Sequence, residues 1–140
     1  MNNVNQKGFS LIELVLVVTI IGIIAAIAAP SLSKAIAAAE NGSAVSTLKN
    51  IALAQSNLVV QRGRFGNLDE VNTLQNGKLG TVSLNVLTRG KFKYEMIPAN
   101  PTPAELKTAY RIKATRVVDA AQTPYVVEMD EKGFITTIFQ

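Results

Sequence analysis

One segment near the start of the chain constrains the fold more than any other. It runs from Phe9 to Ala29 and holds 21 residues with a single charged side chain, Glu13. As an α-helix it would span roughly 31 Å, which is enough to cross the hydrocarbon core of a bilayer. We therefore expect the newly made chain to enter a membrane. Lys7 precedes the segment and favours a cytoplasmic position for that end of the chain.

Three interpretations of this segment compete. A secretory signal peptide would explain Ala26-Ile27-Ala28, which matches the small-x-small cleavage pattern. However, the apolar stretch is longer than the usual h-region of about 7–15 residues, it contains Glu13, and Pro30 follows the candidate cleavage site directly. A single-pass anchor explains the length of the stretch. A carboxylate within it then costs on the order of a few kcal/mol, unless it is paired or lies at the interface in the first helical turn.

The third interpretation accounts for all of these features. The sequence Lys7-Gly8-Phe9-Ser10-Leu11-Ile12-Glu13, followed by an apolar helix with Gly22 and Pro30, closely resembles the N-terminal signature of type IV prepilins. This family includes type IV pilins and type II secretion pseudopilins, and the resemblance covers about residues 7–30. It implies that a prepilin peptidase cleaves between Gly8 and Phe9 and that the new Phe9 amine is N-methylated. It also implies that the apolar helix becomes the core of a filament.

The same resemblance assigns a role in assembly to Phe9 and Glu13. It implies that Glu13 of one subunit pairs with the Phe9 amine of a neighbour, so that both charges are neutralised in a core of low dielectric constant. Losing one member of the pair would strand a buried charge, at a cost of roughly 3–5 kcal/mol. Because Glu13 lies four residues after Phe9, its side chain points back toward the start of the helix.

Two helix-weakening residues lie further along the apolar segment. Pro30 removes a backbone donor, and Gly22 costs roughly 1 kcal/mol relative to alanine. We expect Pro30 to kink the helix or to end it locally. The resemblance implies in addition that residues 22–30 can lose helical hydrogen bonding in an assembled filament, so Gly22 and Pro30 are candidates for helix flexibility.

Beyond Pro30 the helical pattern continues and becomes amphipathic up to about residue 61, where Gly63 and Gly66 end it. Asn41-Gly42 interrupts this pattern and predicts a bend. We expect a helix of about 53 residues whose C-terminal half packs against a small sheet. The predicted organisation is a leader at residues 1–8, a long helix at 9–61 with a membrane or filament-core segment at 9–30, and a globular β-sheet head at 62–140.

Alternation of apolar and polar residues predicts an antiparallel sheet in the head. Strands are expected at residues 91–96, 110–115, 125–129 and 134–139, and the last two form a hairpin across residues 130–133. The connecting region is expected to hold a short helix at Leu68–Leu74 and a short strand at Val82–Leu87. The predicted fold class is therefore α+β and pilin-like: a long N-terminal helix followed by a small antiparallel sheet.

Composition narrows the chemistry of the protein. The chain has no cysteine and no histidine. This removes disulfides, thiolate metal sites, thiol catalysis and the commonest general base. We therefore predict that the protein is not an enzyme and uses no cofactor. We also expect no metal site, because Glu128, Asp130 and Glu131 lack the spacing of a calcium loop. Many type IV pilins close their C-terminal region with a disulfide, and this chain departs from that pattern.

Positive charge is concentrated in one part of the head. Between Lys78 and Arg116 there are eight basic and two acidic residues. Four of the basic side chains are expected on the solvent face of neighbouring strands, where they would offer a patch for DNA or another polyanion: Lys91, Lys93, Arg111 and Lys113. The alternative is an ordinary solvated face that is balanced by Glu128, Asp130 and Glu131.

These observations predict a structural subunit that polymerises through its N-terminal helix into a type IV pilus or a related filament. Its expected partners are copies of itself, a prepilin peptidase and an inner-membrane assembly platform driven by a separate ATPase. We expect the precursor in the inner membrane and the filament at the bacterial cell surface. Two alternatives stay open: a type II secretion pseudopilin, and a membrane-anchored binding module that does not polymerise.

Overall fold

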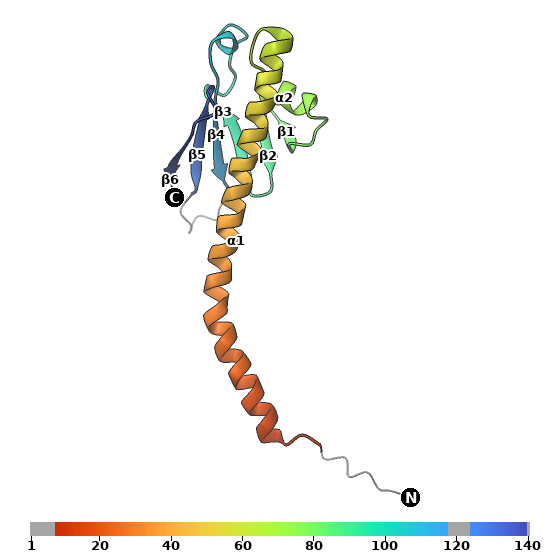
Figure 1. Cartoon of the computed structure of the whole chain (residues 1–140), viewed down its shortest axis with the longest axis vertical. Helices are drawn as coiled ribbons and strands as arrows, with labels where there is room; N and C mark the ends of the chain where they lie inside the picture. The colour runs from red at the N-terminus through yellow and green to blue at the C-terminus, as the bar shows by residue number, and fades with distance from the viewer. Residues whose placement is uncertain (1–7, 118–123, 140) are drawn as a thin grey trace, which may run out of the picture. The chain divides into compact units, whose positions relative to one another are not determined.

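The structure is a computed structural model that describes residues 8–117 and 124–139. It has one long helix, α1 (Leu11–Arg62), and one short helix, α2 (Leu68–Leu74) (Figure 1). A single 3₁₀ turn, η1, covers Glu105–Lys107. The six strands are β1 (Thr81–Ser83), β2 (Val86–Arg89), β3 (Phe92–Met96), β4 (Arg111–Arg116), β5 (Val126–Asp130) and β6 (Ile135–Phe139). The predicted α+β class, with a long N-terminal helix before an antiparallel sheet, is confirmed.

The chain forms two compact units, residues 1–39 and residues 40–140. Within the first unit, α1 is apolar on all sides, and every residue from 8 to 36 is exposed. By length and composition this helix can cross a membrane. The helix is unbroken at Gly22, Pro30 and Asn41-Gly42, so Pro30 does not end it. A proline removes one hydrogen-bond donor, and the turns on either side keep theirs.

The second unit contains a six-stranded meander. The strand order is β1-β2-β3-β4-β5-β6, and each strand pairs antiparallel with the next. Side chains along β3 and β4 alternate between buried and more exposed, as period-2 patterning predicts. Tyr94 lies opposite Ala114 and Met96 lies opposite Ile112, so these buried residues share the face that α1 covers.

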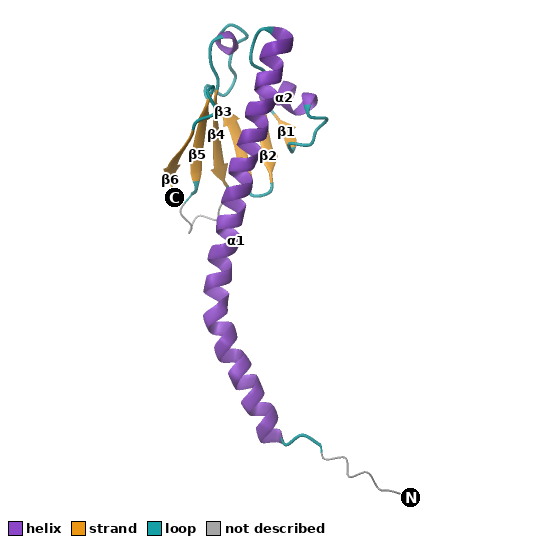
Figure 2. Cartoon of the chain, in the orientation of Figure 1, coloured by secondary structure: helices purple, strands orange, loops and turns teal. Residues whose placement is uncertain are grey.

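The core of this unit lies between one face of the sheet and the C-terminal part of α1, which crosses that face in Figure 2. The helix contributes apolar side chains at intervals of three and four residues, which is the spacing of one helical face: Ala44, Leu48, Ile51, Ala54 and Leu58. The sheet contributes Leu87, Tyr94, Ile112, Val127 and Met129. At the end of α1, the N–H of Gly63 donates to the Val59 carbonyl at 2.9 Å, and Gly63 has the positive φ of +68° that favours glycine at such a cap.

The connecting region differs from expectation at one point. The short helix at Leu68–Leu74 is confirmed as α2, but Val82–Leu87 is a hairpin and not one strand. Leu84 and Asn85 form its two-residue turn with φ of 50° and 62°, as a type I′ turn requires. The Asn85 side chain accepts a hydrogen bond from the Leu68 N–H at 3.0 Å and donates to the Ala99 carbonyl at 2.8 Å. Contacts to two distant segments thus stabilise a turn that a local pattern does not reveal.

Candidate functional site

The predicted cleavage point lies just before the first helical residue. Gly8, Phe9 and Ser10 are non-helical and exposed, and the side chain of Phe9 is 91% exposed. A Cβ atom built on Gly8 would meet no other atom within 4 Å. The fold itself therefore places no steric demand for glycine at this position, and such a demand would come from a processing enzyme. Residues 1–7 of the predicted leader lie outside the described residues.

Glu13 is the third residue of α1, and its carboxylate caps the helix. Its Oε2 accepts a hydrogen bond from the Ser10 N–H at 2.9 Å. The Ser10 carbonyl in turn accepts from the N–H groups of Glu13 at 3.1 Å and Leu14 at 3.2 Å. One of the unpaired donors at the helix start is thereby satisfied, and a negative charge lies at the positive end of the helix dipole. Sequence reasoning missed this role of Ser10, although the S-x-x-E spacing is a known sequence signal for it.

The surface of α1 on both sides of Glu13 is the most apolar exposed surface in the described part of the chain. Fourteen large apolar side chains of α1 from Leu11 to Ile36 are about half exposed or more: Leu11, Ile12, Leu14, Val15, Leu16, Val17, Val18, Ile20, Ile21, Ile23, Ile24, Ile27, Leu32 and Ile36. Water does not tolerate an apolar surface of this extent. This part of α1 must therefore be covered by lipid, by other helices, or by each in turn.

The structure separates the four basic residues that the sequence grouped as one patch. Lys91 lies in the turn between β2 and β3, and its Nζ is 2.8 Å from Glu40 Oε1 of α1. The other three are strand residues, and two of them face carboxylates. Lys113 Nζ is 4.0 Å from Glu95 Oε2.

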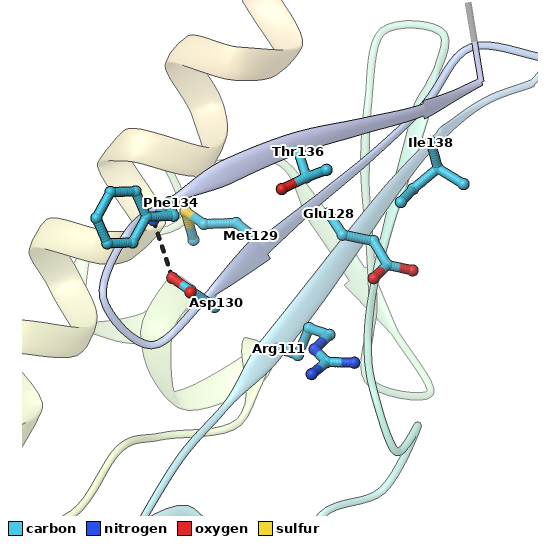
Figure 3. Close-up of a pocket in the computed structure, with 7 residues that line it drawn as sticks. All are labelled: Arg111, Glu128, Met129, Asp130, Phe134, Thr136 and Ile138. Carbon is cyan, nitrogen blue, oxygen red and sulfur yellow. Dashed lines mark hydrogen bonds between the residues drawn. The ribbon is translucent and has the colours of Figure 1, made fainter.

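The pairing of β4 with β5 also places acidic residues opposite basic ones. Lys113 lies opposite Glu128, and Arg111 lies opposite Asp130. In Figure 3, Arg111 and Glu128 flank the same hollow beside β6, a cavity of about 230 Å³. Only Lys93 lies opposite uncharged residues on both sides, Thr88 and Thr115. Such alternation offsets the local excess of positive charge, and the DNA patch stays a prediction.

Three charged side chains of the second unit form a cluster: Glu40, Lys91 and Arg116. Glu40 binds Lys91, and its Oε2 also lies 3.3 Å from an amino group of Arg116. The same Arg116 group donates to Asn41 Oδ1 at 2.6 Å, and the guanidinium lies over the ring of Phe92 at 5.4 Å from the centroid. The hydrogen bond from Lys91 and the nearby positive charges hold the pKa of Glu40 below its usual value, against the opposing effect of desolvation. No local signal could have revealed this cluster, because its members come from distant parts of the sequence.

The acidic residues near the end of the chain belong to a turn. Asp130 Oδ1 accepts hydrogen bonds from the N–H groups of Lys132 at 3.0 Å and Phe134 at 2.9 Å, and the second of these is drawn in Figure 3. Asp130 thus stabilises the reversal between β5 and β6. Within residues 8–117 and 124–139, no three acidic side chains are grouped as a metal site would need.

Comparisons with known proteins agree with the N-terminal geometry. A family model described as the prokaryotic N-terminal methylation motif matches residues 3–29. The type IV major pilin protein PilA of Myxococcus xanthus strain DK1622 is 41% identical over 63 residues. This alignment covers 45% of the present chain and 29% of the Myxococcus protein. No solved structure matches the chain.

Residues 3–29 thus carry a prepilin-type methylation motif, and this motif overlaps the start of a capped apolar helix in a chain of α+β fold. Over these stretches the chain is similar to proteins that carry the N-terminal methylation motif and to a type IV pilin. The aligned segment spans less than a third of the length of the Myxococcus relative.

Proposed function

We propose that this protein is a structural subunit that polymerises through the N-terminal part of α1 into a type IV pilus or a pilus-like filament. The observation that carries the proposal is the continuous apolar surface of α1 that begins at Leu11 and surrounds Glu13. A helix of this kind is stable in a membrane and equally stable in a bundle of identical helices. One segment can therefore serve the precursor and the polymer in turn.

Cleavage between Gly8 and Phe9 supplies the chemistry that starts assembly. It replaces a neutral amide with a cationic amine one residue before Ser10, whose N–H now holds the Glu13 carboxylate. N-methylation of Phe9 would keep that charge. The Glu13 carboxylate of an incoming subunit then has a matching cation on its neighbour, and the pair neutralises two charges inside the bundle. Gly22 and Pro30 would let the helix adjust to its neighbours.

The proposal implies a specific set of partners and places. A prepilin peptidase would cleave the precursor in the inner membrane, and an assembly platform driven by a separate ATPase would extract it. Further copies of the chain would form the helical filament outside the cell. A type II secretion pseudopilin would use the same steps, and the site of the finished polymer distinguishes it from a surface pilus.

Two substitutions at Glu13 separate the charge of this residue from its capping role. Glu13→Ala removes both, whereas Glu13→Gln keeps an oxygen that can accept the Ser10 N–H but has no charge. We expect both variants to be cleaved normally and neither to yield filaments, because a lone amine would be stranded in the core. The measurement is the mass of protein in sheared surface filaments, with intact mass and N-terminal sequence of the membrane fraction.

A matched control uses the same helix. Lys34→Gln removes one exposed charge beyond Pro30 and should leave the yield of filaments unchanged. Wild-type yield from Glu13→Gln would refute charge pairing and leave helix capping as the function of this residue. Gly8→Ser should keep the leader in place and block assembly. A native chain that always begins at Met1 and stays in membranes would refute polymerisation and favour an anchored binding module.

A further inference from the structure

The last strand, β6, forms one edge of the sheet and lacks the usual protection of an edge strand. It ends the strand order and, among the described strands, pairs only with β5 (Figure 1). The other edge strand, β1, has three residues, whereas β6 has five. Natural proteins protect an edge with charged side chains, with proline or by keeping the strand very short. Residues 134–139, Phe-Ile-Thr-Thr-Ile-Phe, contain no charge and no proline, so this edge is open to another strand.

The side chains along this edge are exposed and mostly apolar. Phe134 is 70% exposed and Ile138 is 45% exposed. Thr136 and Thr137 are exposed as well, and Ile135 is partly buried against the core. Phe134, Thr136 and Ile138 line the same hollow of about 230 Å³ (Figure 3). A further strand beside β6 would cover apolar surface that water now contacts.

Hydrogen bonding in the hairpin shows which backbone groups of β6 point outward. The Asp130 N–H donates to the Phe134 carbonyl at 3.1 Å, so the backbone groups of Phe134 point toward β5. In an antiparallel pair, hydrogen-bonded residues alternate with residues whose backbone groups point away from the partner strand. Ile135 and Thr137 are the first and third residues after Phe134. Their N–H and C=O groups therefore point away from β5, toward the position of a new strand.

The segment is complementary to a second copy of itself. A two-fold axis perpendicular to the sheet places side chains of the same face opposite one another, so it passes through a residue. With the axis at Thr136, Ile135 lies opposite Thr137 of the second copy, and their outward groups form about four hydrogen bonds. Phe134 lies opposite Ile138, and such aromatic and β-branched pairs stabilise antiparallel strands. Because the segment has no charge, no like charges meet.

A bulge in β6 favours this register. Thr137 and Phe139 lie opposite consecutive residues of β5, so Ile138 is the extra residue of a bulge. The bulge places Phe139 on the face of Thr136 and not on the face of Thr137. An axis at Thr137 would set Ile135 opposite Phe139, and these side chains lie on different faces. An axis at Thr136 avoids this conflict.

We propose that β6 pairs antiparallel with β6 of a second copy of this chain, about a two-fold axis at Thr136. Such a contact uses the same surface of both copies and closes after two, so it cannot extend a helical filament. It joins the heads of two separate filaments side by side. This use of the contact rests on the proposed function, whereas the pairing itself does not. The contact is small beside a stable interface of about 1,200–2,000 Å², so single heads pair weakly and two arrays of heads associate strongly.

The absence of cysteine from the sequence permits a cross-linking test of the register. Opposite residues of a non-hydrogen-bonded pair have Cα atoms about 4.5 Å apart, and disulfides need about 4.4–6.8 Å. Thr136→Cys in the full-length chain, oxidised mildly in detergent micelles, should give a disulfide dimer that increases with protein concentration. The matched control is Thr137→Cys, whose two copies are diagonal neighbours about 7–8 Å apart and should lose the dimer. Equal dimer from the two variants would overturn the proposed register.

Charge at the axis separates loss of pairing from loss of folding. Thr136→Lys and Thr136→Glu each place like charges opposite one another at an exposed position. In low-speed sedimentation of purified filaments, each variant alone should lose lateral association, and a mixture of the two should regain it. Misfolded heads would not be rescued by mixing. The control is the same pair of substitutions at Thr73, an exposed residue of α2, which should leave sedimentation unchanged.

The outcomes keep this inference separate from the proposed function. Sedimentation at the native level from either Thr136 variant alone would refute the lateral contact. If the native chain yields no filaments, the proposed function fails, and cross-linking in micelles still decides whether β6 pairs. If filaments form but Thr136→Cys gives no dimer in micelles or between filaments, the pairing alone is refuted.

Discussion

Replacing Gln55 by leucine tests whether one buried amide connects α1 to the segment that follows it. Gln55 is fully buried on α1, and its side-chain amide makes two hydrogen bonds with the backbone of Gly66. Its Nε2 donates to the Gly66 carbonyl at 2.8 Å, and its Oε1 accepts from the Gly66 N–H at 2.7 Å. Leucine has a similar volume and can make neither bond.

The magnitude follows from the two backbone groups that the substitution leaves unpaired. Gly66 is itself buried, so water cannot replace the lost partners. Each unsatisfied buried group costs about 1–3 kcal/mol. The greater apolar surface of leucine regains on the order of 1 kcal/mol. We therefore expect Gln55→Leu to lower the free energy of unfolding of the head by about 1–5 kcal/mol.

The assay is urea unfolding of the full-length chain in detergent micelles, followed by tyrosine fluorescence. The protein has no tryptophan, and all three of its tyrosines lie in the head: Tyr94, Tyr110 and Tyr125. The control is Gln61→Leu, an identical replacement at an exposed position of the same helix, which should change stability by no more than about 0.5 kcal/mol. Equal changes in the free energy of unfolding for the two substitutions would refute the reasoning, because burial of the amide would then make no difference to stability.

Two further predictions concern the same end of the head. A Cβ on Gly66 would lie 2.5 Å from Leu58 Cδ1, so Gly66→Ala should lower the free energy of unfolding in urea by about 1–3 kcal/mol. A Cβ on Gly42, within α1, would meet no atom within 4 Å, so Gly42→Ala should raise it by about 0.5–1 kcal/mol. The opposite order of the two effects would contradict the packing argument. The hydrogen bond from Arg64 holds the pKa of Glu70 below its ordinary value of 4.5. Its contribution to stability is therefore present above pH 4.5 and is lost as the pH falls through the lower pKa of the folded state. Glu70→Gln should make unfolding less sensitive to pH in this acidic range, and an unchanged pH profile would refute the assignment.

The predictions that succeeded from sequence rest on local regularities. The apolar run from Phe9 to Ala29 needs no partner within the chain to be recognised, and the prepilin signature lies within a few residues of it. The alternation along β3 and β4 arises because successive side chains of a strand point to opposite faces. Such patterns persist whatever the rest of the chain does.

The predictions that failed or were incomplete depend on residues far apart in the sequence. Val82–Leu87 is a hairpin because Asn85 bonds to Leu68 and Ala99 and so favours a turn within an otherwise strand-like run. The basic residues of the head were predicted to form one patch because they are close together in the sequence. Register places carboxylates opposite Lys113 and Arg111, and α1 supplies Glu40 to Lys91.

The sequence by itself determined that this chain has a membrane-competent helix with a carboxylate at its start and a small sheet after it. Those features follow from hydrophobicity and period, which are properties of neighbouring residues. Only the tertiary structure decided that Gln55 is a buried anchor, that Ser10 and Glu13 share a hydrogen bond, and that Lys91 and Arg116 both pair with Glu40. The physical reason is that hydrogen bonds and ion pairs act over a few ångströms in space, and spatial proximity between distant residues exists only once the chain has folded.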